Sequence, residues 1–557
     1  MHATRPDRRP RTSGRLGASV VAVTLALMAA ACGGDDDAEQ GQSSPSTTAA
    51  TGATTGPSSA PSGPTTEAPP DDVDSEGVLR IGLDLTATGG LDLDPIEMDS
   101  PVDFHVHYNI YDTLLRQHED GSYEPGLAAS ATITNPSTIE IELRDGVTFQ
   151  DGTDFDAEAV KFSIERNIAA NKLAPFRMAE LGQIASITVQ DPLHLTINLS
   201  SPTAGSFYNL LAHNETLVVS PTAVRNGVNL NENPVGAGPF KVASYARESR
   251  LVLEKWDGYF QADQIKLAGI EYVQTTVASV VQALRSDAID VASLPPDLLR
   301  QLEGSGLELR NEPSPNAISF VNLRCDTVEA FQDVRVRQAL NYATDKEAMN
   351  QVLFAGLGEP MSQVWPSWSP YYNADLAHVY DRDLDKAKDL LAQAGHPSLS
   401  LSMAVLPGAS QRAGELLQQQ WAEAGVTVTL IPATNFVQEF LLDKKMDTSP
   451  VAAQSRLWTD KVTRNFAPGS TGYTCPAEDQ AFKDKLLELR GYAPDDPAAV
   501  NAWKELSTLL SEQALTVFMA NGTVANAWNS DVLGNPTWNP NQLGTLWPDV
   551  HRVYVKQ

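Results

Sequence analysis

Three histidines lie close together in the chain, and they are the first side chains that could do chemistry. His105 and His107 are separated by one residue, and His118 follows in the same stretch. Imidazole nitrogens bind transition metals, so this spacing raises the question of a metal site. Side chains at i and i+2 share a face only on a strand, whereas this stretch has the pattern of a helix start. We therefore expect no metal site here, and we expect no cofactor.

The motifs of common catalytic sites are absent from the sequence. It has no G-x-S-x-G elbow, no G-x-x-x-x-G-K-[ST] phosphate loop, no H-E-x-x-H motif and no paired C-x-x-C. Many carboxylates could act as general acids or bases, but their spacing singles out no pair. We therefore predict that the protein is not an enzyme.

The N-terminus has the pattern of an export signal. A basic head of arginines precedes an uncharged run from Leu16 to Ala31. This run is shorter than the roughly 20 residues that a membrane-spanning helix needs, and it ends in small residues, as signal peptides do. Its end, Ala29-Ala30-Ala31-Cys32-Gly33, resembles the lipobox of bacterial lipoproteins, with Ala29 where Leu is usual. The resemblance implies that residues 1–31 are removed and that Cys32 carries the lipid.

Residues 32–76 are rich in Ser, Thr, Pro and Gly and contain no aromatic residue. Such a segment cannot bury enough apolar surface to order itself, so we expect a disordered tether. Because an exported protein lies in an oxidising space, the two remaining cysteines, Cys325 and Cys475, can form a disulfide. Two buried free thiols are the alternative.

The length and charge of the chain narrow its class. Its 557 residues exceed one ordinary core and predict two or three lobes. Acidic residues outnumber basic ones, 70 to 40, for a net charge of −30. This balance argues against a nucleic-acid partner, which would require clustered basic residues. Solubility is the first interpretation of the acidity, and attraction of cationic ligands is the second.

Strand and helix patterns alternate from Val78 onward. Apolar residues alternate with polar ones over 139–143, 193–199 and 426–430, which predicts three half-buried strands. Helical spacing follows Asp156 and Asp345, which are good N-caps, and a third helix before Gly395 is expected to end there. The body of the chain is therefore expected to have an α/β fold.

Seven segments, in order, resemble family 5 of the extracellular solute-binding proteins, the oligopeptide-, dipeptide- and nickel-binding group. Their order and spacing agree with the family from about residue 78 to 557, and Asp287 departs from the family pattern where Gly is usual. The segments are Ile110–Leu115, Pro125–Ala128, Leu143–Thr153, Pro234–Phe240, Ala283–Val291, Phe331–Asp345 and Tyr380–Leu391.

The resemblance implies a periplasmic-binding-protein-like α/β fold of three lobes, with the ligand cleft between lobes I and III. Lobe I would combine 77–114, 204–314 and 521–557, lobe II would be 115–203, and lobe III would be 315–520. The chain would cross the hinge near Ser314–Val321 and Phe518–Asn521. Such proteins close around their ligand.

The resemblance also implies a set of ligand-binding residues. In peptide-binding members the ligand lies extended, and an acidic residue after a tryptophan holds its ammonium group. Here the tryptophan is Trp458, but the family acid falls at Lys461, with Asp460 one place early. The expected ligand-binding residues are Met98, Asp99, Phe436, Trp458, Asp460 and Asn521.

The expected function is therefore capture of a solute, above all oligopeptides, for an ABC importer. The protein would be a monomer, anchored by lipid to the extracytoplasmic face of a bacterial membrane, beside a permease and without a nucleic-acid partner. Oligosaccharides and metal chelates are alternative ligands. A tethered ligand sensor and a hydrolase on a binding-protein scaffold are alternative functions.

Overall fold

The structure is a computed structural model that describes residues 72–86, 91–97, 101–118, 122–173, 175–454, 475, 480–493, 496–540 and 546–557. The chain divides into residues 1–67 and 68–557, and all of the described residues belong to the second unit. The export signal, Cys32 and most of the expected tether lie outside the described residues. Among the helices of the described ranges, none is long and apolar enough to cross a membrane.

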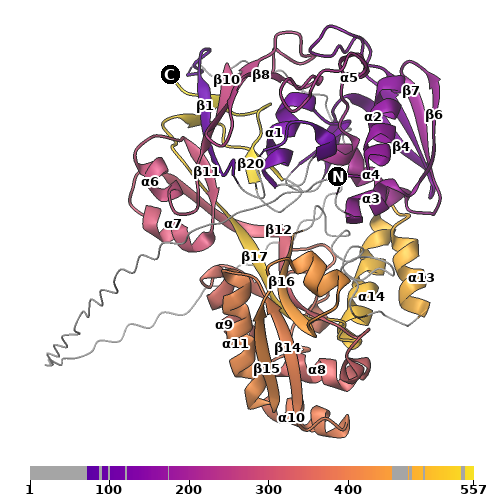
Figure 1. The fold of residues 1–557 in the computed structure, drawn as a ribbon, viewed down its shortest axis with the longest axis vertical. Coiled ribbons are helices and arrows are strands. Elements are labelled where there is room, and N and C mark those ends of the chain that lie inside the picture. The colour runs from indigo at the N-terminus through magenta and orange to yellow at the C-terminus, as the bar shows by residue number, and fades with distance from the viewer. Residues whose placement is uncertain are drawn as a thin grey trace, which may run out of the picture. The chain divides into compact units, whose positions relative to one another are not determined.

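A mixed sheet of eleven strands organises the second unit (Figure 1). In one half, β1 pairs in parallel with β10 and β11, and β9 and β8 continue antiparallel from β10. The strands of this half are β8 (Phe240–Ala246), β9 (Arg250–Lys255), β10 (Gly269–Gln274), β1 (Val78–Leu83) and β11 (Val291–Leu294).

The other half of the sheet is built on two long antiparallel strands, β12 (Glu308–Leu323) and β17 (Val517–Trp528). Strand β17 pairs with β11, and β12 pairs with β16, so these two strands join both halves. Their register shifts between Pro313 and Ile318 and again between Ser319 and Phe320. The remaining strands are β16 (Thr448–Gln454), β14 (Leu399–Val405), β15 (Val426–Pro432) and β13 (Glu359–Pro360).

Helices cover each half of the sheet. Trp365, Trp421 and Trp503 are fully buried in the cluster beneath the second half. Its helices are α8 (Val334–Ala343), α9 (Lys346–Phe354), α10 (Leu384–Gln393), α11 (Ala409–Glu423), α13 (Gln480–Leu489) and α14 (Pro497–Glu512). The first half packs against α1 (Pro101–Tyr111), α5 (Pro221–Arg225), α6 (Val280–Arg285) and α7 (Pro296–Leu302).

A separate antiparallel sheet has the order β4-β5-β7-β6 and its own hydrophobic cluster around Phe149 and Phe155. Its elements are β4 (Ala128–Asn135), β5 (Thr138–Leu143), β7 (His194–Leu199), β6 (Ile184–Asp191), α2 (Ala157–Ala170), α3 (Pro175–Leu181) and α4 (Ala204–Tyr208). Short strands complete the fold: β2 (Leu115–Gln117), β3 (Tyr123–Pro125), β18 (Leu533–Gly534), β19 (Trp538–Pro540), β20 (Leu546–Pro548) and β21 (Tyr554–Val555).

The structure confirms the strands and helix ends that were predicted from short stretches of consecutive residues. The three alternating stretches form β5, β7 and β15. The Asp156 side chain accepts a hydrogen bond from the Ala159 backbone N–H at 2.8 Å, and Asp345 caps α9 in the same way. Gly395 follows the last turn of α10 with φ of +83°, a conformation that glycine adopts readily.

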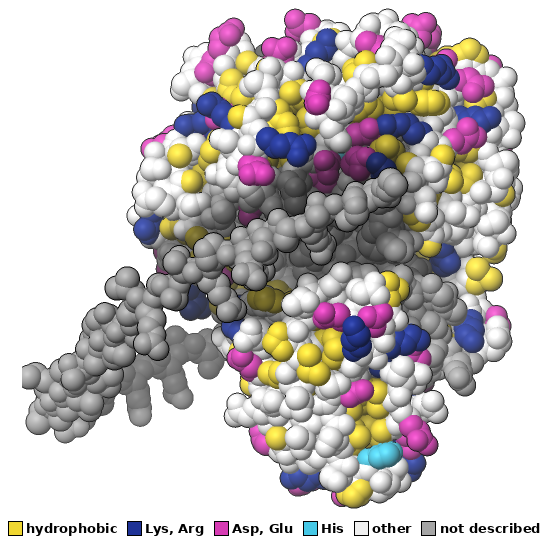
Figure 2. All heavy atoms as spheres, viewed as in Figure 1, with side chains coloured by type: hydrophobic (Ala, Val, Ile, Leu, Met, Phe, Trp, Pro, Cys, Tyr) yellow, Lys and Arg dark blue, Asp and Glu magenta, His cyan; other side chains and the backbone are white. Residues whose placement is uncertain are grey.

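On the face seen in Figure 2, basic and acidic side chains are interspersed among the described residues.

Candidate functional site

Helix α1 is held at its C-terminal end by glycines from two of the motif segments. The Gly238 backbone N–H donates to the Ile110 carbonyl at 2.9 Å. A Cβ on Gly236 would lie 2.3 Å from that same oxygen, and a Cβ on Gly126 would lie 2.3 Å from the Thr113 carbonyl. Any side chain would prevent this approach, so these glycines determine where α1 presents its side chains.

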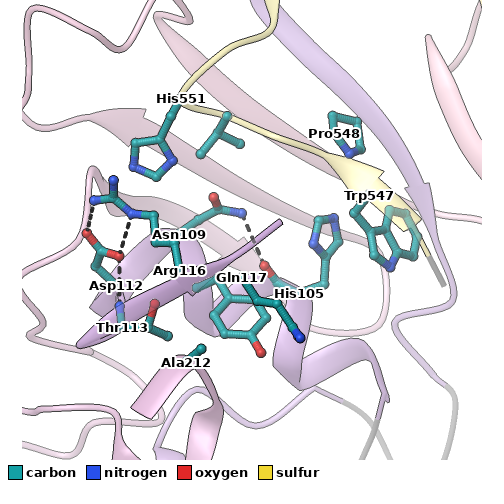
Figure 3. A pocket seen from close by; sticks show the side chains of 12 residues that line it. His105, Asn109, Asp112, Thr113, Arg116, Gln117, Ala212, Trp547, Pro548 and His551 are labelled. Carbon is teal, nitrogen blue, oxygen red and sulfur yellow. Dashed lines mark hydrogen bonds and ion pairs between the residues drawn. The ribbon is translucent and has the colours of Figure 1, made fainter. Parts of the chain in front are cut away.

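Helix α1, strand β2 and the C-terminal segment surround a small recess (Figure 3). Helix α1 contributes His105 and Asn109, and β2 contributes Arg116. The C-terminal segment contributes Trp547 and His551. Hydrogen-bonding groups and aromatic rings from opposite ends of the chain therefore face the same space.

The charges in the recess are paired. Arg116 Nη2 lies 2.8 Å from Asp112 Oδ2, and the Tyr259 hydroxyl donates to the same oxygen at 2.6 Å. Tyr259 Oη in turn lies 3.0 Å from His551 Nε2. Burial would raise the pKa of Asp112, but the charge and hydrogen bonds of Arg116 outweigh it, so this pKa lies below its ordinary value. The carboxylate of Asp112 and the guanidinium of Arg116 therefore neutralise each other within the recess.

His105 forms the aromatic wall of the recess together with Trp547. The two rings stack with centroids 4.1 Å apart, and Tyr272 meets His105 edge-on at 5.3 Å. Burial lowers the pKa of His105 to about 3, so its imidazole is neutral at physiological pH. Its Nε2 is buried and has no hydrogen-bond partner among the described residues.

The other two histidines point to different partners. His107 Nε2 lies 2.8 Å from the Asp92 carbonyl, and burial lowers the pKa of His107 to about 4. His118 Nε2 lies 3.1 Å from Glu124 Oε2. Within the ranges that the structure describes, no group of three or more His, Cys, Asp or Glu side chains could hold a metal ion.

A second hollow, an open groove that is larger than the recess, borders the same C-terminal segment. Asp549 and Arg552 line this groove, whereas Trp547 and His551 line the recess. Across the groove, the rings of Trp528 and Trp538 lie 5.3 Å apart, and both line it. Aromatic faces and polar groups that converge in this way are typical of sites that hold organic ligands.

The structure brings neither of the two described sequence-predicted ligand residues into these hollows. Phe436 stacks on Phe440 at 5.1 Å in a small cluster beyond β14 and β15. Asn521 is buried in β17, where it pairs with Ile318 of β12 and Glu359 of β13, so three strands meet at this residue. The other four predicted residues, Met98, Asp99, Trp458 and Asp460, lie outside the described residues.

Cys325 and Cys475 are joined by a disulfide in the structure. Cys325 lies just after β12, and Cys475 precedes α13. The bond therefore ties the end of a sheet-joining strand to the chain that leads into α13.

Trp547, His551 and Arg116 line the recess but were not among the ligand-binding residues predicted from the sequence. A tryptophan and a histidine close to the C-terminus were visible in the sequence. Nothing local indicated that they fold back onto α1, because the contact spans almost the whole folded chain.

Comparison with known proteins places these observations in a family. Residues 122–472 match the model for bacterial extracellular solute-binding proteins, family 5 Middle. The chain is 30% identical over 360 residues to the glutathione-binding protein GsiB of Shigella flexneri, covering 63% of this chain and 68% of that protein. GsiB of Escherichia coli strain K12 is also 30% identical over 360 residues, with the same coverage of 63% and 68%.

Two solved structures share the fold. The periplasmic binding protein DppA from Helicobacter pylori, in complex with peptide STSA, gives a TM-score of 0.71 at 20% identity, covering 87% of this chain and 99% of that one. NikA from Staphylococcus aureus, in complex with Ni(L-His)2, gives 0.68 at 20% identity, covering 86% of this chain and 100% of that one.

Proposed function

Since the chain belongs to family 5 of the bacterial extracellular solute-binding proteins, we propose that it captures short peptides for an ABC importer. Support for the peptide class comes from relatives that bind glutathione and from fold neighbours that bind short peptides. The family match is the observation that carries this proposal. The homologues are binding proteins, so the chemistry required is reversible capture without bond cleavage.

The proposed capture mechanism is closure of lobe III on lobe I around the ligand. Strands β12 and β17 support it, because they join the two halves of the large sheet and their register shifts between Pro313 and Phe320. The separate hydrophobic clusters around Trp421, Tyr272 and Phe149 support three lobes. A ligand that contacts both sides of the cleft favours the closed state by its differential contacts.

The proposed location is the outer face of the cell membrane. Its support is the signal-like N-terminus ending at Cys32 and the family description as extracellular. A diacylated cysteine would hold the protein stably at a membrane surface, as a monomer beside its permease.

The proposal is tested by identifying what the protein carries. The chain is purified, mildly denatured, and the released molecules are identified by mass spectrometry. The refolded protein is then screened by thermal shift against glutathione, di- to pentapeptides, oligosaccharides and nickel–histidine. A peptide at 100 times its Kd is expected to stabilise the folded state by about 2.7 kcal/mol.

Each outcome decides between ligand classes. Peptides that are released intact and that stabilise the refolded protein support the proposal. Stabilisation by sugars or nickel–histidine alone would overturn the peptide assignment and leave the family unchanged. Cleavage of a bound peptide would overturn the binding role itself.

A further inference from the structure

Two regions far apart in the sequence meet at a small polar contact. One is the turn Arg490–Tyr492 that follows α13, and the other is the start of α4. The Ser206 backbone N–H donates to the Arg490 carbonyl at 3.0 Å. Arg490 Nη2 donates to Gln183 Oε1 at 2.8 Å, and Thr203 Oγ1 donates to the same amide oxygen at 2.7 Å.

Glycine makes this contact possible. A Cβ on Gly205 would lie only 1.5 Å from the Tyr492 carbonyl oxygen and 3.1 Å from that of Arg490. On the opposite side, a Cβ on Gly491 would lie 3.2 Å from the Pro202 carbonyl. The two backbones therefore touch directly, and no side chain at position 205 is compatible with the contact.

The contact is not a consequence of chain connectivity. Gln183 and Gly205 belong to the β4–β7 sheet and the helix that follows it, whereas Arg490 belongs to the part that β12 and β17 connect to the rest. In Figure 1, α13 lies beneath α4 on the side of the unit away from β12 and β17. A rotation about those two strands that moved α13 away from α4 would break the contact between the two backbones.

We propose that Gln183, Gly205, Ser206 and Arg490 form a latch that holds the cleft closed before any ligand binds. This inference rests on the hinge closure of the proposed function and adds to it a device outside the ligand site. If only the closed form binds ligand tightly, the apparent Kd equals the intrinsic Kd divided by the closed fraction. The latch would then change the apparent affinity for every ligand by the same factor, although it contacts no ligand.

The test is amide hydrogen exchange of the full chain without ligand, resolved to single residues. The Ser206 amide bonds across the contact, whereas the neighbouring Phe207 amide bonds to Thr203 within α4 at 2.9 Å. Opening of the latch therefore exposes Ser206 and leaves Phe207 protected, whereas unfolding of α4 exposes both.

We expect Arg490→Ala to speed exchange at Ser206 by about 2- to 10-fold, the loss of one hydrogen bond of ordinary net strength. Gly205→Ala is expected to speed it further, since its Cβ forbids the contact while alanine is a good helix former. Arg335→Ala is the matched control, because Arg335 pairs with Asp333 in its own turn, 2.6 Å away. It should change neither amide.

Two results would overturn the latch. One is unchanged Ser206 exchange in both Arg490→Ala and Gly205→Ala. The other is equal acceleration at Ser206 and Phe207, which would mean local unfolding instead. Because no ligand is added, either result is independent of whether the protein binds peptides.

Discussion

At the scale of single residues, Lys346 has an unusual environment for a charged group. Lys346 is the first residue of α9 and its side chain is almost wholly buried, with Nζ donating to Ser362 Oγ at 3.2 Å and to the Tyr380 carbonyl. Burial lowers the pKa of this ammonium to about 7, and the nearby acids Asp381 and Glu347 offset burial only in part. Its charge is therefore lost within the range of pH in which the protein can be studied.

The sign of the pH effect follows from linkage. In the unfolded chain this lysine titrates near 10.4, so between pH 7 and about 10 the unfolded state binds more protons. The free energy of unfolding should therefore rise with pH across this window, by at most about 1.4 kcal/mol per pH unit. Lys346→Met should lack this rise, as measured by urea unfolding at pH 6.5, 8 and 9.5. Parallel pH curves for the two proteins would contradict the buried charge.

At the scale of elements, the position of α1 depends on close backbone contacts at its C-terminal end. Gly238 has the Ile110 carbonyl carbon 2.6 Å from where its Cβ would be, and Gly236 is equally crowded against the same turn. These contacts hold the end of α1, and with it the face that carries His105 and Asn109. The family-like glycine segment therefore acts as a packing surface for a helix.

Gly238→Ala should lower the free energy of unfolding by about 1–3 kcal/mol, because the added methyl group meets backbone that cannot move aside. Gly146→Ala is the matched comparison, since Gly146 has φ of +73° and nothing within 4 Å of its Cβ position. Its cost should come from backbone strain alone, about 1 kcal/mol. Thermal and urea unfolding would measure both. Equal losses would mean that crowding at α1 is unimportant.

At the scale of the whole molecule, two connections cross between the halves of the large sheet, and one disulfide closes a long loop beside them. The loop between Cys325 and Cys475 spans 150 residues and includes α8 to α11. Cross-linking so long a loop restricts the unfolded chain, which favours the folded state. The bond thus stabilises the part of the molecule that the latch holds against α4.

Replacing both cysteines, Cys325→Ala with Cys475→Ala, should lower the free energy of unfolding by about 2–5 kcal/mol. Guanidinium unfolding of the oxidised protein and of the double variant would measure the loss. A reductant should bring the original protein down to the variant and leave the variant unchanged. A variant as stable as the oxidised protein would show that the bond contributes nothing.

The elements that were predicted correctly depend on interactions between residues that are close together in the sequence. The alternation in β5 and the cap that Asp156 forms on α2 depend on contacts within about four residues, and such contacts are written in consecutive positions. The family match was also foreseeable, because its seven segments keep their order and spacing. The ligand-binding residues, in contrast, come from distant parts of the chain. Phe436 and Asn521 line neither hollow, and all six predicted ligand residues stay predictions.

By itself, the sequence determined an α/β body, the positions of many strands and caps, and membership of a solute-binding family, while the signal-like N-terminus stays a prediction. Only the tertiary structure decided that Trp547 stacks on His105, that His551 joins Tyr259 and Asp112, and that Arg490 meets Ser206. The physical reason is distance along the chain. Periodicity and capping arise between neighbours, whereas these contacts form only once separate hydrophobic clusters have fixed where their surfaces meet.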